Sequence, residues 1–124
     1  MEKKQKIKSF TDLIVWQKAH EMVLLIYKIT EKFPHKEIYA LISQIRRAAV
    51  SITSNIAEGF SRKSLKEKGQ FYYMALGSNT ELQNQFIIAK DLGYITKDEF
   101  DKVINGLIQI NKLINGLIKS LSKF

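Results

Sequence analysis

The sequence predicts an all-α protein, folded as an antiparallel up-down-up-down four-helix bundle. Apolar residues recur at steps of three and four along four separate stretches, which is the period of an amphipathic helix. Short segments containing Pro34, Gly59 or Gly93 separate these stretches. Because short connections place consecutive helices side by side, the four helices are expected to pack against one another in order.

The chain of 124 residues has the length of one domain. We expect residues 1–9 to form a flexible basic arm and residues 10–124 to form the single bundle domain. Such an arm either solubilises the protein or lies along phosphate groups. The basic residues of the arm are Lys3, Lys4, Lys6 and Lys8.

The first helix is predicted over about residues 12–33, because Thr11 or Asp12 can cap it and Pro34 prevents its continuation. Trp16 and His20 lie one turn apart on its apolar face. A core tryptophan beside a hydrogen-bonded histidine is favoured there over a stacking or catalytic pair. The apolar face comprises Leu13, Trp16, Ala19, His20, Val23, Ile26, Tyr27 and Thr30.

The second helix, predicted over about residues 37–59, has two contrasting faces. Gly59 fits the left-handed residue that ends many helices. The apolar stripe comprises Ile38, Leu41, Ile42, Ile45, Ala49, Ile52 and Ile56. The polar stripe comprises Arg47, Ser51, Ser54, Asn55 and Glu58, with Arg46 at its border.

The third helix is predicted over about residues 64–92, with Ser64 and Glu67 in a capping-box pattern. Tyr72 and Tyr73 are adjacent, so one faces inward and the other outward. An outward Tyr73 can stack on a base or lie in a protein interface. The inward positions are Leu65, Tyr72, Ala75, Leu76, Asn79, Leu82, Phe86 and Ala89.

The fourth helix is predicted over about residues 96–122, opened by Thr96 and Glu99 in a second capping-box pattern. The repeated segment INGLI contains Asn-Gly, a hairpin signal. The apolar period of about 3.5 residues favours a helix instead. Asn111 is a polar residue in the apolar seam, where it can fix register or oligomeric state. The seam comprises Phe100, Val103, Ile104, Leu107, Ile110, Ile114, Leu117 and Leu121.

Three separated motifs, in order, resemble the 23S rRNA intervening-sequence protein family. They read FTDLIVWQKAHEMVLLIYKIT, SQIRRAAVSITSNIAEGF and MALGSNTELQNQFIIAKDLGYI, and the likeness extends over about residues 10–121. One departure is Thr53, where the family commonly has proline. The resemblance implies an antiparallel four-helix bundle that assembles into a ring-shaped homo-oligomer, a pentamer. It implies no established activity.

Composition narrows the function classes. Lys and Arg number 20 against 12 Asp and Glu, so the net charge is +8, which favours polyanionic partners. No cysteine is present, which excludes disulfides and thiolate catalysis. No apolar run approaches the roughly 18 residues of a membrane span, so we expect a cytoplasmic protein without a membrane partner.

The sequence shows no pattern for catalysis, a cofactor or a metal. Bundle di-iron sites use Glu-x-x-His pairs, but Gln17 and Lys32 stand three residues before the two histidines, His20 and His35. We therefore expect no catalytic residues, no cofactor and no metal site. Glu58 and Glu81 are better interpreted as ion-pair partners of Arg46 or Arg47 across adjacent helices.

Clustered basic residues are the feature of the sequence that indicates a binding function. Arginine can bind phosphate through two hydrogen bonds at once. For the pair Arg46 and Arg47, structural ion pairs and a polyanion-binding surface are equally favoured interpretations. The candidate nucleic-acid-binding residues are Lys3, Lys4, Lys6, Lys8, Arg46, Arg47, Arg62, Lys63, Lys66 and Lys68.

The function hypothesis is a non-enzymatic, ring-forming protein that binds structured RNA or DNA. The first and fourth helices carry apolar surface wider than one seam requires, which argues for self-association. The accessory proteins of diversity-generating retroelements look similar in bundle and ring and are basic nucleic-acid partners of a reverse transcriptase. The alternative is a protein–protein interaction scaffold without a direct nucleic-acid role.

Overall fold

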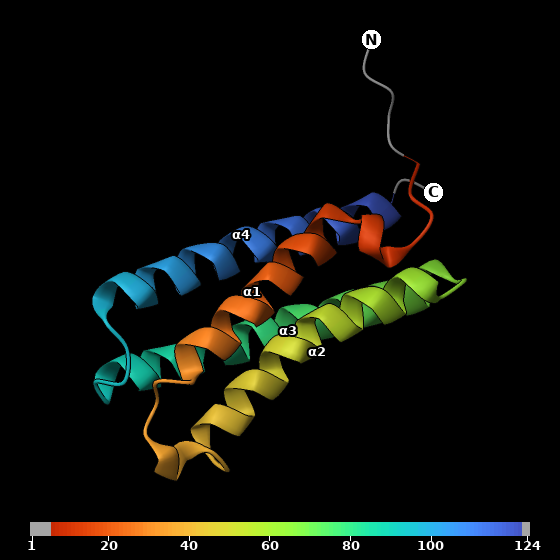
Figure 1. The fold of residues 1–124 in the computed structure, drawn as a ribbon. Helices are drawn as coiled ribbons and strands as arrows, with labels where there is room; N and C mark the ends of the chain where they lie inside the picture. Colours follow the sequence, from red (N-terminus) through yellow and green to blue (C-terminus); the bar gives the residue numbers. More distant parts are fainter. Residues whose placement is uncertain (1–5, 123–124) are drawn as a thin grey trace.

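The computed structural model describes residues 6–122 and is all-α, with four long helices in sequence. Successive helices run in opposite directions (Figure 1). Each helix packs against the next one, and α1 also packs against α4. The elements are η1 (Phe10–Asp12), α1 (Ile14–Thr30), η2 (His35–Glu37), α2 (Leu41–Ser61), α3 (Leu65–Asp91) and α4 (Lys97–Leu121).

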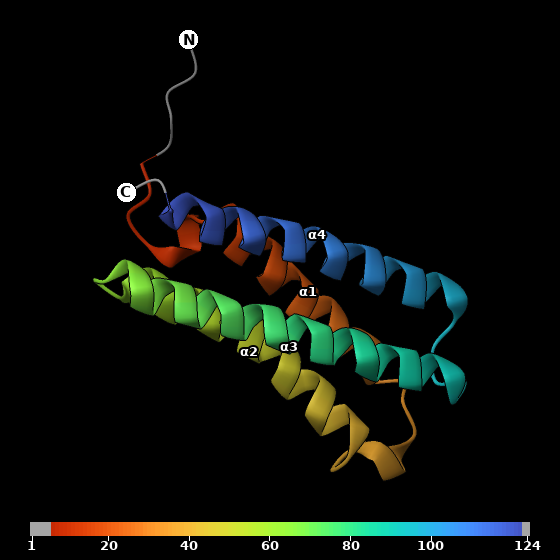
Figure 2. The same cartoon turned by 180° about the vertical axis from the view of Figure 1, so that it is seen from behind.

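The ends of the bundle differ in what they bring together. Figure 2 shows η1, the α2–α3 turn and the end of α4 at one end, with the α1–α2 and α3–α4 connections at the other. At the latter end α2 diverges from α3 (Figure 2). In the part of the chain with described coordinates, no helix is long and apolar enough to span a membrane.

Local capping confirms the predicted starts of the third and fourth helices. Ser64 Oγ accepts from the Glu67 N–H at 3.1 Å, and Thr96 Oγ1 accepts from the Glu99 N–H at 3.1 Å. The Glu99 carboxylate accepts in return from the Thr96 N–H at 3.1 Å. Gly93, after α3, has φ +79°, a left-handed conformation that glycine adopts without steric cost.

The second helix begins at Leu41, so the predicted start near residue 37 was wrong. Ala40 leaves the helical region with φ −124° and ψ −104°. Glu37 lies in η2, where its carboxylate accepts from the Tyr94 hydroxyl at 2.8 Å and from the Leu41 N–H at 3.4 Å. Glu37 therefore caps α2 from outside the helix.

The first helix is also shorter than predicted. It begins at Ile14, because Leu13 is extended, and it ends at Thr30. The segment before it is ordered by the Asp12 carboxylate, which accepts from the N–H groups of Lys8 at 2.9 Å and Ser9 at 3.0 Å. These backbone hydrogen bonds lower the pKa of Asp12.

The prediction that Gly59 ends α2 in a left-handed conformation was wrong. Gly59 lies inside α2, and among the described residues only Gly93 has a positive φ. A Cβ at Gly59 would lie 2.6 Å from Cε1 of Tyr72. Glycine is therefore required here by the close approach of α2 and α3.

The core contains most of the predicted apolar stripe of α2 and the seam of α4, and α1 buries the predicted Ala19, Ile26 and Thr30 together with a neighbouring row that was not predicted. Val15, Met22 and Ile29 of α1 are buried, whereas His20 and Tyr27 are exposed. The reason is that α1 packs against both α2 and α4, so the residues that face either neighbour are buried. Ile38 and Leu65, predicted to face inward, are also exposed.

Polar side chains fix the register of α3 against its neighbours. Asn79, fully buried, donates from Nδ2 to the Leu107 carbonyl of α4 at 3.0 Å. Ser51 of α2 and Ser78 of α3 share a hydrogen bond of 2.8 Å, and Asn55 Nδ2 donates to Ser51 Oγ at 3.0 Å. Since buried polar groups require partners, these bonds favour one alignment of the helices.

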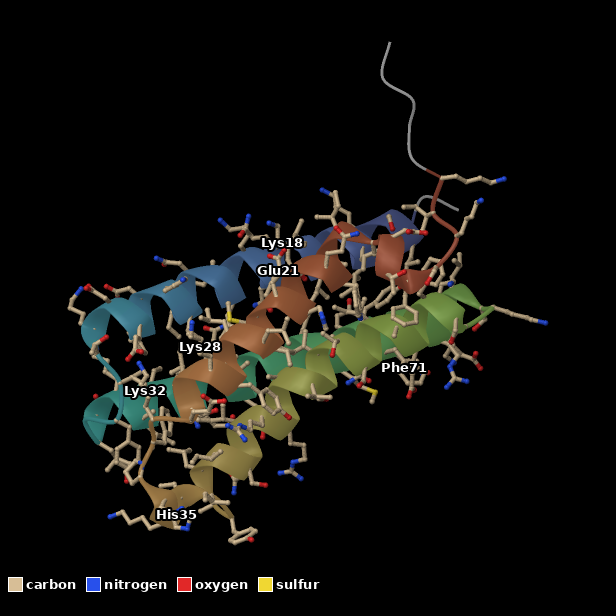
Figure 3. The ribbon with its side chains drawn as sticks, in the orientation of Figure 1. Lys18, Glu21, Lys28, Lys32, His35 and Phe71 are labelled. Carbon is tan, nitrogen blue, oxygen red and sulfur yellow. The ribbon has the colours of Figure 1, made fainter. Side chains whose placement is uncertain are left out.

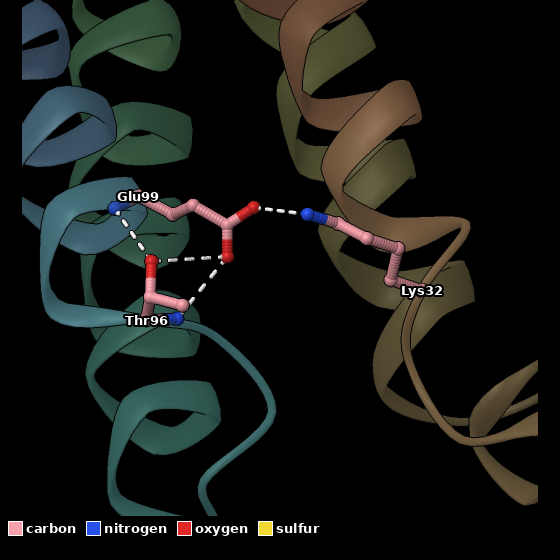
Figure 4. Close-up of polar contacts among 3 residues, drawn as sticks. All are labelled: Lys32, Thr96 and Glu99. Carbon is pink, nitrogen blue, oxygen red and sulfur yellow. Dashed lines mark hydrogen bonds and ion pairs between the residues drawn. The ribbon is translucent and has the colours of Figure 1, made fainter.

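The connections at the diverging end are held by contacts between distant residues. Lys32 forms an ion pair with Glu99 across the α1 and α4 ends (Figure 4). Hydrogen bonding from Lys32, and then from the Thr96 backbone, lowers the pKa of Glu99. The rings of Phe33 and Tyr94 lie 5.5 Å apart. These contacts position η2 beside the start of α2.

Candidate functional site

An open groove lies between the end of α1, η2 and the outward face of α2, with a volume of about 960 Å³. We call it the α2 groove. It lies where α2 diverges from the other helices, and Glu37 of η2 is fixed at this end by its bond to Tyr94. Its lining residues are Tyr27, Thr30, Glu31, Phe33, His35, Ile38, Tyr39, Ile42, Ser43, Arg46, Arg47, Val50, Ser51 and Ser54.

Arg46 is held in place without being neutralised. Its Nε–H donates to Thr30 Oγ1 at 3.0 Å, and Nη2 donates to the Tyr27 carbonyl at 3.3 Å. The guanidinium lies over the Tyr27 ring, 4.5 Å from the centroid. Thr30 Oγ1 can accept because its own hydrogen is donated to the Ile26 carbonyl at 2.8 Å. Nη1 of Arg46 has no partner among residues 6–122.

Arg47 is exposed on the groove wall, and neither Arg46 nor Arg47 forms an ion pair within the described part of the chain. The predicted ion pairs with Glu58 and Glu81 were wrong. Glu58 pairs with Arg62 at 3.6 Å, and Glu81 accepts from Gln85 Nε2 at 3.1 Å. The groove therefore presents two positive charges that form no ion pair with a described carboxylate.

The comparisons with known proteins identify the family. Residues 11–116 match the family described as 23S rRNA-intervening sequence protein. The chain belongs to this family. The match spans the α2 groove, the first three long helices and most of α4.

A solved structure agrees with the fold of this 23S rRNA-intervening sequence family member. It is a protein of unknown function from the S23 ribosomal protein family of Bacteroides thetaiotaomicron, with a TM-score of 0.78 and 23% identity. The alignment covers 86% of this chain and 96% of that one. At this identity the likeness shows a shared fold. No curated protein matches the chain.

The second basic region of this family member is the turn cluster, Arg62, Lys63, Lys66 and Lys68, at the α2–α3 turn. Lys68 donates to the Phe60 carbonyl at 2.7 Å and to the Gly59 carbonyl at 3.4 Å, so it caps the C-terminus of α2. Arg62 lies over the Phe71 ring at 4.6 Å and pairs with Glu58. Lys63 and Lys66 are exposed.

Two of the four lysines of the predicted N-terminal arm lie within the described residues, and two lie outside them. Lys3 and Lys4 lie outside the described residues. Lys6 and Lys8 are exposed, and they precede η1, which lies at the same end of the bundle as the α2–α3 turn (Figure 1). Figure 3 shows His35, in η2, and Phe71, near this turn, at opposite ends of α2. The candidate basic residues therefore form two separate regions.

Trp16 is partly buried against the core as predicted, and His20 stacks on it from the surface. Their rings are nearly parallel, with centroids 4.7 Å apart, and His20 is exposed. Phe10 of η1 packs edge-on against Trp16 at 5.4 Å. The prediction of a buried histidine was wrong, because the buried face of α1 passes through Ala19 and Met22.

Four apolar side chains are exposed along one side of α3, the α3 face, and of these only an outward Tyr73 was predicted from the sequence. Tyr73, Met74, Ile87 and Ile88 are exposed on α3, Tyr73 by 62%, whereas Tyr72 is buried. The predicted wide apolar surface of the first helix is present at Ile14 and Leu24. The signal for the α3 face was available, since apolar residues of α3 occur on all sides of the helix.

Proposed function

We propose that this protein is a non-enzymatic, ring-forming protein that binds structured RNA or DNA, mainly through phosphate. One observation carries the proposal: Arg46 and Arg47 lie on the wall of an open groove without a carboxylate partner in residues 6–122. An arginine fork that is positioned but not neutralised is suited to a phosphate oxygen.

The charge distribution supports a polyanionic partner. The net charge is +8, and the exposed lysines Lys6, Lys8, Lys63 and Lys66 lie toward the end of the bundle opposite the α2 groove. Two separated basic regions can contact phosphates at two places along one nucleic acid. Neutralised phosphates release counterions, so each region adds affinity that depends on salt.

Ring formation is supported by exposed apolar surface. The α3 face exposes Tyr73, Met74, Ile87 and Ile88, and α1 exposes Ile14 and Leu24. On α3 the exposed polar Thr80, Glu81 and Asn84 separate two apolar pairs, so the contact with a second copy would be made at several small apolar sites. A ring repeats each basic region around an axis, and this repetition converts weak phosphate contacts into avidity.

The second candidate function is a protein–protein interaction scaffold. The same α3 face favours it, because exposed tyrosine, methionine and isoleucine residues suit a protein partner as well as a second copy. In that case Arg46 and Arg47 would bind a carboxylate of the partner, and nucleic acid would not bind.

The test is fluorescence anisotropy with a structured RNA and a duplex DNA of equal length, across a range of salt. We expect binding with a log–log salt slope of several phosphates, and Arg47→Gln lowers that slope by about one. Lys112→Gln, an exposed lysine on α4 away from both regions, is the matched control. Light scattering reports the assembly state of every sample.

Two results would count against the proposal. Absence of binding at low salt by assembled protein would remove the nucleic-acid role and leave the scaffold. A monomer at all concentrations would remove ring formation. Arg46→Gln is used only together with a thermal melt, because Arg46 also joins α2 to α1.

A further inference from the structure

Tyr39 projects from the turn between η2 and α2 and is 97% exposed, the most exposed of the large apolar side chains. The backbone around it is held by neighbours, since Glu37 bonds to both Leu41 and Tyr94. Tyr39 therefore presents an uncovered aromatic ring, from a backbone held in place, at the edge of the α2 groove.

The α2 wall of the groove combines positive charge with hydroxyl groups. Nη1 of Arg46 and the exposed guanidinium of Arg47 are free to donate within the described chain. Ser43 and Ser54 lie on the same outward face of α2, and their hydroxyls can donate or accept. Glu31 is the only carboxylate among the groove-lining residues, and it lies on the α1 wall.

We infer that the α2 groove receives an unpaired nucleotide of a structured RNA, with the base stacked on Tyr39 and the phosphate held by Arg46 and Arg47. This inference rests on the proposed function and assigns one site to it. Glu31 then faces the sugar and base, where a carboxylate can accept from a 2′-hydroxyl or an exocyclic amino group.

An unpaired nucleotide fits the groove better than a duplex does. A duplex buries the faces of its bases, so it would leave the Tyr39 ring and the apolar Ile38 and Val50 of the groove without use. A bulged or looped base exposes a flat face, and stacking on an aromatic side chain is the common way in which RNA-binding proteins capture it. The positively charged α2 wall of the groove can hold the phosphate of the same nucleotide.

The experiment compares an RNA hairpin carrying a single-nucleotide bulge with a fully paired hairpin of the same length. Tyr39→Ala is expected to weaken binding of the bulged hairpin by about tenfold, since base stacking contributes about 1–3 kcal/mol. In the same variant, the affinity for the paired hairpin is expected to stay within about twofold of that of the unmodified protein. Tyr39→Phe retains the ring and binds the bulged hairpin as the unmodified protein does.

The matched control is Leu92→Ala, which removes an exposed apolar side chain after α3, outside the residues that line the groove, and leaves the preference for the bulge unchanged. Equal affinity for both hairpins, or an equal loss for both in Tyr39→Ala, would overturn the inference while the proposed function stands. Loss of assembly in Tyr39→Ala would also overturn it, because Tyr39 would then be a subunit contact. Failure of both hairpins to bind would remove the proposed function itself.

Discussion

The α2 groove and the turn cluster use arginine in nearly the same way, yet they differ in what remains available. Arg46 lies 4.5 Å from the centre of the Tyr27 ring, and Arg62 lies 4.6 Å from the centre of Phe71. Arg62 also pairs with Glu58, whereas Arg46 bonds only to a hydroxyl and a carbonyl oxygen within residues 6–122. An arginine held by neutral groups keeps its charge for a ligand.

The lysines show the same contrast within the turn cluster. Lys68 is occupied by the carbonyls at the end of α2, while Lys63 and Lys66 project into solvent. A run of basic residues in sequence therefore contains both structural and available charges. The comparison predicts that a change at Lys68 reduces stability, whereas a change at Arg47 reduces binding.

The largest expected effect tests the packing beside the turn cluster. Gly59→Ala is expected to lower the free energy of unfolding by about 2 kcal/mol, because the new Cβ would collide with the Tyr72 ring. Gly77→Ala is the control, since a Cβ there meets nothing within 4 Å, and we expect a small gain from better helix propensity. Chemical denaturation measures the free energy of unfolding of both variants, and equal free energies would contradict the assigned role of Gly59.

The next effect separates the two arginines. Arg47→Gln is expected to weaken RNA binding by about tenfold at low salt and to leave the unfolding free energy unchanged. Arg62→Gln is expected to have little effect on binding, because Glu58 already offsets its charge. Anisotropy and thermal melts on both variants test the contrast. A larger binding loss for Arg62→Gln would reverse the comparison.

A smaller effect is expected at the lysine that caps α2. Lys68→Met removes the donor to the Phe60 and Gly59 carbonyls and is expected to lower the free energy of unfolding by about 1 kcal/mol. Lys66→Met, two residues away and exposed, is expected to leave stability unchanged. The same denaturation experiment distinguishes them, and indistinguishable variants would show that Lys68 is not a cap.

The smallest effect concerns pH and the ion pair between Lys32 and Glu99. The pKa of Glu99 is lowered in the folded protein, first by Lys32 and then by the Thr96 backbone, from an ordinary value of 4.5. The stabilisation by Glu99 is therefore present above pH 4.5 and is lost as the pH falls through the lower folded pKa. Stability measured from pH 7 downward should fall less steeply in Glu99→Gln. If stability falls equally steeply at low pH in Glu99→Gln and in the unmodified protein, this ion pair contributes no pH dependence.

Some features that were missed had a local signal. Glu58 and Arg62 are four residues apart, the spacing of an ion pair on one helix face, but the predicted end of the second helix at residue 59 excluded Arg62. The exposed face of α3 was visible in the scatter of its apolar residues, although nothing local says which side a neighbour covers. These errors came from element boundaries and from the choice of buried face.

The sequence by itself determined the four helices, the caps at Ser64 and Thr96, the turn at Gly93 and the family, because each depends on residues close together in the chain. Only the tertiary structure decided where α2 begins, because Glu37 bonds to Tyr94, which is 57 positions away. It also decided that Gly59 accommodates Tyr72 and that Arg46 rests on Thr30 and Tyr27. These outcomes depend on which helix surfaces meet, and local periodicity does not specify a residue's partner on another helix.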